Sequence, residues 1–168
     1  MKLLIASDIH GSAVWCKKLV DAFMKEGADK LVLLGDILYH GPRNPLPDGY
    51  SPKDVFGMLN PLADRIIAVR GNCDSEVDQM VLAFNISSDY GDIFADGVHI
   101  AISHGHRTVP PLGKGDVYIT GHTHVPLNVA EKEGYLHLNP GSVSLPKEDS
   151  AHGYILFDGG KFVFKDLN

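Results

Sequence analysis

Aspartate, asparagine and histidine side chains recur along the chain in short clusters, each directly after an apolar run. The clusters supply Asp8, His10, Asp36, Asn72, His104, His122 and His124. Carboxylate oxygens, an amide oxygen and imidazole nitrogens form a mixed ligand set that suits divalent transition metals. Seven side chains exceed the needs of one ion, whereas two ions that share a bridging carboxylate would use them all. The residue types therefore predict a two-metal site of the kind that hydrolyses phosphate esters.

Taken singly, most of these clusters have a simpler structural explanation. Asp8 suits a helix cap, Asp36 a turn at a strand end, and Asn72 a turn residue with positive φ. A lone histidine is more often hydrogen-bonded within a core than bound to a metal. His122 and His124 are the hardest to explain away, because two imidazoles on one face of an extended segment match metal chelation. Chance alone is a poor explanation for ligand-type residues at all five strand ends.

The apolar runs before the clusters predict the elements that position them. "KLLIA", "KLVLL", "RIIAV", "VHIAI" and "DVYIT" are short, rich in β-branched residues and bounded by Gly and Asp, as buried strands are. Their near-continuous apolarity indicates sheets covered on both faces. In open α/β sheets, ligands bind beyond the carboxyl ends of the strands, so clusters far apart in the chain are expected to converge there.

Helix signals lie between the first strands. Trp15, Leu19 and Phe23 recur every four residues within a helix predicted from about residue 12 to 26, and Gly27 suits its C-terminal cap. "SPKD", residues 51–54, predicts a second helix start, with Ser51 as N-cap. This alternation of strands and helices implies parallel strands joined by right-handed crossovers.

Two proline- and glycine-rich segments each leave two interpretations open. "YHGPRNPLPDGYSP", residues 39–52, is either a rigid surface connection or a wall beside the site. "NPGSVSLPK", residues 139–147, is either a plain turn or a segment whose Asn139, Gly141 and Ser142 shape the pocket. After residue 84 the chain carries mainly strand signals, with "YLHLN", "YILF" and "KFVF" following the runs named above.

The overall composition limits the class of protein. We expect a single domain over residues 1–168, since this length can bury about 70% of the surface of the unfolded chain. A net charge of −6 argues against a stable nucleic-acid complex, which needs clustered cations. Two cysteines, Cys16 and Cys73, fit a reducing compartment, and no apolar run reaches the length of a membrane span. We therefore expect a cytoplasmic protein.

Five sequence blocks together resemble one known family. "SDIHG", "LLGDIL", "RGNCD", "SHGH" and "GHTHVP" are similar to the signature blocks of the calcineurin-like metallophosphoesterase superfamily. The surrounding segments resemble a group of bacterial phosphodiesterases within it. The resemblance implies an α/β fold of two facing mixed β-sheets flanked by helices. It also implies ligand sets of Asp8, His10 and His124 for one ion, Asn72, His104 and His122 for another, and Asp36 as the bridge.

Cys73 departs from the family pattern. The resembling block is usually G-N-H followed by an acidic residue, and its histidine is thought to protonate the leaving oxygen. A thiol has an ordinary pKa near 8.5 and offers no cationic donor at neutral pH, and nearby dications favour its thiolate. Loss of a general acid typically removes about 10² to 10⁴ in rate. Cys73 is therefore not expected to attack phosphorus. It is a weak donor, a soft auxiliary contact or a plain small side chain, and we expect it to tune leaving-group preference.

The resemblance implies a metal-dependent phosphodiesterase with a metal-bound hydroxide as nucleophile. Its ions would be two divalent cations, Mn²⁺ in the first place, with Zn²⁺, Fe²⁺ and Ni²⁺ as alternatives. Asp36, Asn72 and Cys73 are the candidate catalytic residues, and Asn72, His106 and Arg43 the candidate contacts to a small phosphodiester. Two alternatives stay open: a phosphomonoesterase at the same site, and a non-catalytic scaffold resembling a retromer subunit. No membrane partner is expected, and a homodimer or higher homo-oligomer is a further candidate.

Overall fold

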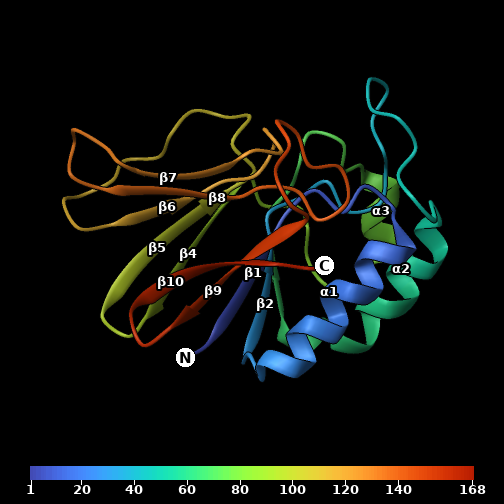
Figure 1. Cartoon of the computed structure of the whole chain (residues 1–168), viewed down its shortest axis with the longest axis horizontal. Helices are drawn as coiled ribbons and strands as arrows, with labels where there is room; N and C mark the ends of the chain where they lie inside the picture. The colour runs from blue at the N-terminus through green and yellow to red at the C-terminus, as the bar shows by residue number, and fades with distance from the viewer.

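The computed structural model describes all 168 residues and shows two five-stranded sheets packed face to face (Figure 1). The first sheet has the strand order β10-β9-β1-β2-β3, and the second has the order β4-β5-β6-β8-β7. The strands are β1 (Leu3–Ala6), β2 (Lys30–Leu33), β3 (Ile66–Ala68), β4 (Tyr90–Ala95), β5 (Val98–Ser103), β6 (Val117–Ile119), β7 (Pro126–Ala130), β8 (Leu136–Pro140), β9 (Gly153–Asp158) and β10 (Lys161–Asp166). The helices are α1 (Ala13–Glu26), α2 (Pro52–Leu59) and α3 (Glu76–Val81), and a 3-10 helix spans Asn60–Arg65. The predicted fold of two facing mixed sheets is confirmed.

Parallel pairing brings the important strand ends to one edge of the molecule. In the first sheet β1 pairs in parallel with β2, and β2 with β3. In the second sheet β5, β6 and β8 are parallel neighbours. Strands β9 and β10 are antiparallel and extend the first sheet beyond β1. The loops that follow β1, β2, β3, β5 and β6 therefore gather at the same end, along the upper edge of Figure 1.

Two apolar layers result from the alternation of side chains along the strands. Leu3 and Ile5 of β1 face the second sheet, where they pack in a cluster with Ile100 and Ile119. Leu4 faces the helices and belongs to the other core cluster. Helices cover only the outer face of the first sheet (Figure 1). The expectation of sheets covered on both faces therefore holds for the first sheet, and no helix covers the outer face of the second.

The helix starts agree with the sequence except in one detail. Ser12 caps α1 by accepting a hydrogen bond from the backbone N–H of Trp15, and Gly27 ends the helix in the left-handed conformation. Helix α2 begins at Pro52 as predicted. However, Ser51 does not cap it with its side chain, because the Ser51 hydroxyl donates to the Asp54 carboxylate at 2.7 Å.

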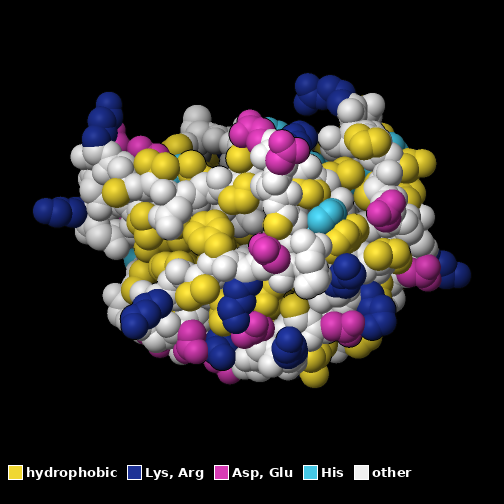
Figure 2. Space-filling model, viewed as in Figure 1, with side chains coloured by type: hydrophobic (Ala, Val, Ile, Leu, Met, Phe, Trp, Pro, Cys, Tyr) yellow, Lys and Arg dark blue, Asp and Glu magenta, His cyan; other side chains and the backbone are white.

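The surface shown in Figure 2 carries interspersed charges of both signs. Lys and Arg side chains are separated by Asp and Glu side chains on this face and do not merge into one continuous basic area. Hydrophobic side chains gather between β10 and the second sheet. None of the helices combines the length and the apolar character that crossing a membrane requires.

Candidate metal centre

The seven predicted side chains meet in one place. Each lies in a loop directly after the carboxyl end of β1, β2, β3, β5 or β6. His10 and His124 are 114 positions apart in the chain, yet their Nε2 atoms are 3.1 Å apart. The convergence expected from the strand ends is therefore present in the structure, and the side chains fall into two subsets around Asp36.

The first subset is Asp8, His10 and His124, and all three side chains are buried. Asp8 Oδ1 lies 3.4 Å from His10 Nε2 and 3.2 Å from His124 Nε2. The three candidate ligand atoms lie within 4.8 Å of one another. Two nitrogens and one carboxylate oxygen therefore converge on a single point.

The second subset is Asn72, His104 and His122. Asn72 Oδ1 lies 3.0 Å from His104 Nε2 and 2.7 Å from His122 Nδ1. Asp36 stands between the subsets, because its Oδ2 is 3.3 Å from His104 Nε2 and 3.7 Å from His10 Nε2. His104 and Asp36 are buried, whereas Asn72 is exposed and His122 half-buried. The centre is thus open to solvent on the side of Asn72 and His122.

Backbone carbonyls fix the orientation of three imidazole rings. His10 Nδ1 is 2.8 Å from the Tyr39 carbonyl, and His104 Nδ1 is 2.7 Å from the Leu34 carbonyl. His124 Nδ1 makes the same contact with the Leu145 carbonyl at 2.7 Å. Since a carbonyl only accepts, each Nδ1 must carry the proton. Metal-binding histidines are held in this way, with the second nitrogen free to coordinate.

This orientation leaves acceptors facing one another at the centre. In neutral His10 and His124, both Nε2 atoms present lone pairs across 3.1 Å, and Asp8 Oδ1 beside them is buried without a hydrogen-bond partner. Buried polar atoms are normally paired, so an arrangement of three acceptors without a donor needs a positive charge. A divalent cation fits the donor set, because it would meet all three atoms at once.

The ionisable groups at the centre shift one another's pKa values. If the two histidines are instead protonated, burial still opposes ionisation of Asp8, but hydrogen bonds from His10 and His124 outweigh it and hold the Asp8 pKa far below its usual range. Burial would lower the pKa of His104, but the hydrogen bond to Asp36 and the charges of both carboxylates raise it to about 9. Burial, together with the nearby His104 charge, lowers the pKa of His122. The two carboxylates therefore make the centre a strong attractor of positive charge.

The backbone of the site is held in an unusual conformation. Eight residues other than glycine have positive φ, and five of them are Asp8 (60°), His10 (49°), Asp36 (54°), His122 (70°) and His124 (63°). A non-glycine residue in this region is strained and persists only where its surroundings enforce it. Strain at so many predicted ligands indicates that the loops are shaped for the position of these side chains.

Asp74 is a positioning residue that the sequence reasoning missed. Its buried carboxylate accepts hydrogen bonds from the backbone N–H groups of Asp36 (2.8 Å), Ile37 (2.9 Å) and Gly71 (2.7 Å). It therefore ties the loop after β2 to the loop after β3, and so ties Asp36 to Asn72. The one hint in the sequence was that Asp74 is an acidic residue directly after "GNC".

The segment 139–147 supports the site from behind, so neither prior interpretation was complete. The Ser142 hydroxyl donates to the Asp8 carbonyl at 2.9 Å, and the Ser144 hydroxyl does so at 3.2 Å. The Asn139 side-chain amide donates to the Gly121 carbonyl at 2.7 Å. Asn139 and Ser142 thus hold the loops of Asp8 and His122 in place and do not line the main cavity. Gly141 accommodates the turn with φ of 81°.

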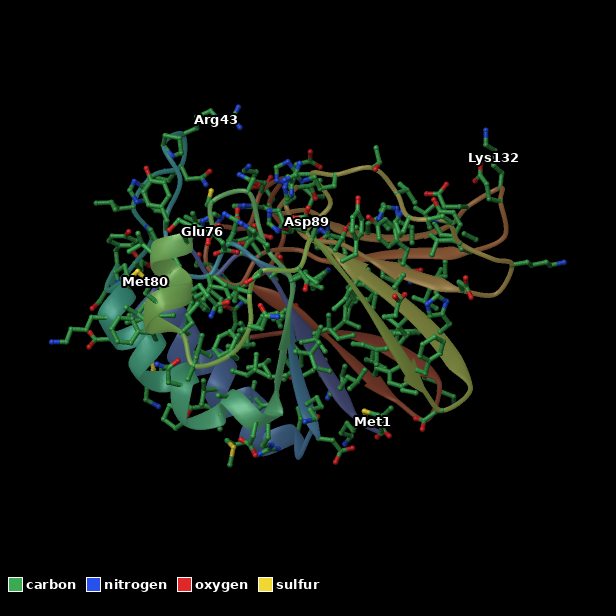
Figure 3. The ribbon with its side chains drawn as sticks, turned by 180° about the vertical axis from the view of Figure 1, so that it is seen from behind. Met1, Arg43, Glu76, Met80, Asp89 and Lys132 are labelled. Carbon is green, nitrogen blue, oxygen red and sulfur yellow. The ribbon has the colours of Figure 1, made fainter.

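The loop 39–52 forms a wall of the cavity in front of the centre. The cavity has a volume of about 480 Å³, and Tyr39, Arg43 and Asn44 line it opposite Asn72 and Cys73. Arg43 projects from the tip of the loop, well above α3 (Figure 3). Of the two interpretations of this loop, the wall beside the site is the one that the geometry favours.

Cys73 and His106 occupy different sides of the centre. The Cys73 thiol belongs to a group of possible ligands with His10 and Asp36. Burial, followed by the charge of Asp36, raises the pKa of Cys73 to about 12, so the protein's own groups favour the thiol and not the thiolate. His106 lies beside His104, with ring centroids 5.4 Å apart, and its Nδ1 is buried without a partner. His106 does not line the cavity that contains Arg43.

The chain belongs to the calcineurin-like phosphoesterase superfamily, whose domain matches residues 1–161. Within it, the resemblance to a bacterial phosphodiesterase group is confirmed. Phosphodiesterase YfcE of Escherichia coli strain K12 is 47% identical over 173 residues, which cover 100% of this chain and 93% of that protein. The solved structure of the E. coli phosphoesterase YfcE matches with a TM-score of 0.96 and 44% identity, over 100% of this chain and 94% of that one. The chain is thus an enzyme of the phosphoesterase class.

More distant structures share the fold alone. A novel archaeal phosphodiesterase has a TM-score of 0.71 at 22% identity, with 98% of this chain and 99% of that chain covered. Vps29 of Entamoeba histolytica, solved in complex with Zn²⁺, has a TM-score of 0.62 at 18% identity, with both chains fully covered.

Proposed function

We propose that this protein is a metal-dependent phosphodiesterase that uses two divalent ions, of which Mn²⁺ is the first choice. The observation that carries the proposal is the pair of ligand subsets with Asp36 between them, together with the unpartnered Oδ1 of Asp8. The 47% identity to a protein named as a phosphodiesterase favours diesters as the substrate class. Residues 1–168 are proposed to act as one domain.

The proposed division of ligands follows the two subsets. Asp8, His10 and His124 would hold one ion, Asn72, His104 and His122 the other, and Asp36 both. When bound, two such cations lower the pKa of water and offset the charge that develops on a phosphate. Carbonyl contacts at Nδ1 keep the His10, His104 and His124 rings in coordinating orientation, so little reorganisation is needed when substrate arrives.

The exposed side of the centre is where a phosphate ester would bind. Asn72 is exposed there, and its Oδ1 serves the second subset while its Nδ2 points to the Cys73 sulfur at 3.4 Å. That amide could turn its N–H to a phosphate oxygen. Arg43 would approach the substrate from the loop, and His106 from the His104 side. Cys73 would contact the departing ester oxygen only as a weak donor, which favours substrates whose leaving group needs little protonation.

The cavity favours a diester over a monoester. Arg43 is the single Lys or Arg among its lining residues. A diester carries one negative charge, whereas a monoester dianion carries two and needs more positive neighbours. The phosphomonoesterase and the non-catalytic scaffold nevertheless define the other outcomes of the test below.

The test compares hydrolysis of bis-p-nitrophenyl phosphate with that of p-nitrophenyl phosphate. The protein is stripped with a chelator and re-supplied with Mn²⁺, Zn²⁺, Fe²⁺ or Ni²⁺, and Mn²⁺ binding is measured separately by calorimetry. Asp36→Asn should lose both the diesterase activity and part of the Mn²⁺ binding. Asp21→Asn is the matched control, since Asp21 is an exposed α1 residue paired with Lys17. Preference for the monoester would replace the proposal with a phosphatase, and two bound ions without any hydrolysis would favour the scaffold.

The cellular setting is proposed from composition. The two unpaired cysteines and the net charge of −6 support a cytoplasmic protein without a stable nucleic-acid complex. A homodimer or higher homo-oligomer is proposed, and sedimentation of the purified protein tests it.

A further inference from the structure

A second cavity adjoins the one in front of the centre. It has a volume of about 340 Å³ and shares Tyr39, Cys73 and Ser75 with the first. Its other walls include Leu38, Tyr50, Pro52 and Val77, so it lies between the loop 39–52 and the start of α3. We call this second cavity the apolar groove. It begins where the polar centre ends, at Cys73.

The apolar groove exposes hydrophobic side chains to water beside a highly charged site. Tyr39 is 41% exposed and Val77 is 66% exposed. The single charged side chain on the wall is Asp78, whose carboxylate already accepts a hydrogen bond from the Ser75 backbone N–H at 2.8 Å. The apolar groove therefore offers hydrophobic contact and no cation for a second phosphate.

The loop wall of the apolar groove is fixed in place before any ligand binds. The Tyr39 carbonyl accepts from His10 Nδ1, and the Ser51 backbone N–H donates to the Gly11 carbonyl at 2.8 Å. The ring of His40 packs edge-on against Tyr39 and Tyr50, with centroid distances of 4.8 and 5.1 Å. A site that is already ordered loses less entropy on binding, so its apolar contacts translate more fully into affinity.

We propose that the substrate is a phosphodiester with one aromatic ester group, and that this group lies in the apolar groove against Tyr39 and Val77. This proposal rests on the proposed phosphodiesterase function, because the phosphate must sit at the metal centre for the ester group to reach past Cys73. An aromatic group matches the exposed ring of Tyr39, since aromatic pairs gain from offset or edge-on packing beyond simple burial. A longer polynucleotide chain does not fit, because its next phosphate would meet Asp78 and no cation.

The experiment measures binding of two phosphonates, which carry one organic group and resist hydrolysis. Phenylphosphonate and ethylphosphonate are titrated by calorimetry into the Mn²⁺-loaded protein. An aromatic contact of ordinary strength predicts about 2- to 12-fold tighter binding of phenylphosphonate. Val77→Gln should reduce that preference while leaving the ethylphosphonate affinity nearly unchanged, and Tyr39→Ala should reduce the preference as well.

Met80→Gln is the matched control. Met80 is 83% exposed on the same helix as Val77, lines neither cavity, and lies on α3 well below the loop tip marked by Arg43 (Figure 3). It should keep the full preference for phenylphosphonate. Tyr39→Phe retains the ring and should also keep most of it.

The outcomes separate this inference from the function on which it rests. If diester hydrolysis persists while both phosphonates bind equally, the apolar groove does not bind an aromatic ester group, and the proposed phosphodiesterase function still stands. Absence of diester hydrolysis with every metal would instead overturn the proposed function. Sedimentation of Val77→Gln covers one more case. If the variant loses self-association and keeps its phosphonate preference, the apolar groove is a contact between copies of the chain and the inference is wrong.

Discussion

Replacing Asp74 should damage both the fold and the metal centre, because one buried carboxylate joins two loops. Its Oδ2 accepts from the N–H groups of Asp36 and Gly71, and its Oδ1 accepts from that of Ile37. Burial raises the pKa of Asp74, whereas these three hydrogen bonds favour the ionised form. We consider two substitutions. Asp74→Ala removes both acceptor oxygens, whereas Asp74→Asn keeps one acceptor oxygen.

The magnitudes follow from the donors left without a partner. An unsatisfied buried donor costs about 1–3 kcal/mol, so three of them set an upper range of about 3–9 kcal/mol for Asp74→Ala. Single substitutions above about 4–5 kcal/mol are exceptional because loops relax, so about 3–5 kcal/mol is expected. In Asp74→Asn the amide oxygen can replace Oδ2 and keep two bonds. Its NH₂ group then faces the Ile37 N–H, which costs about 1–3 kcal/mol.

The assay is urea unfolding of chelator-stripped protein, followed by Mn²⁺ titration of each variant. Stability should fall in the order wild type, Asp74→Asn, Asp74→Ala. Mn²⁺ should bind about 10- to 100-fold more weakly to Asp74→Asn, as is typical when a group that orients metal ligands is lost. Asp21→Asn, on the exposed face of α1, should change the free energy of unfolding by no more than about 0.5 kcal/mol.

Two results would refute this reasoning in different ways. If Asp74→Ala unfolds within about 1 kcal/mol of wild type, the three amides find water or other partners and the bonds carry little net stability. If stability falls as expected but Mn²⁺ affinity does not, Asp74 supports the fold without positioning Asp36 and Asn72.

Three further changes test other parts of the structure. Gly121→Ala should weaken Mn²⁺ binding and cost about 1–3 kcal/mol of stability by overpacking, because the added Cβ would meet side chains of the turn after β1; Gly57→Ala, in open space on α2, is its control. Cys73→His should raise kcat more for alkyl than for p-nitrophenyl diesters, and equal gains would contradict a leaving-group role. Glu26, whose pKa is lowered chiefly by its hydrogen bond to Lys165, should stabilise the fold at neutral pH. That contribution should fade as the pH falls below about 4.3, so urea midpoints of wild type and Glu26→Gln should converge there.

Most of the strands that the sequence predicted are largely buried, and the edge strand β10 is the exposed exception. Runs such as "KLLIA" and "VHIAI" are largely apolar, and each became a strand with a parallel neighbour. Strands β4 and β7 were missed because they lie at the edges of the second sheet, where side chains face solvent. Helix α3 was also missed. It has no buried residue, and its start depends on a capping box between Ser75 and Asp78.

The positions of the candidate ligands could be predicted because strand direction alone brings them together. The hydrogen bonds that orient these ligands could not be predicted. The carbonyls of Leu34, Tyr39 and Leu145 hold three imidazoles, and any residue type can supply a carbonyl. The positive φ of residues such as His122 likewise cannot be predicted from the sequence, since even Asp and His, which adopt it more often than most residues, do so at only a minority of positions. Sequence patterns thus predict which side chains could bind a metal ion, whereas the packing of the loops determines how those side chains are oriented.

The fold by itself does not decide between an enzyme and a scaffold. Vps29 of Entamoeba histolytica shares this architecture at 18% identity, and fold likeness at that level carries no activity. The specific features of this chain lie in the loops: an acceptor cluster at Asp8 without a donor, a carboxylate at Asp36 shared by two subsets, and Asp74 between their loops. The first two features cost stability unless positive charge occupies the centre, because like charges and lone pairs are held together in a buried place. Such an arrangement is better explained by a working metal centre than by an interaction surface, which would gain nothing from it.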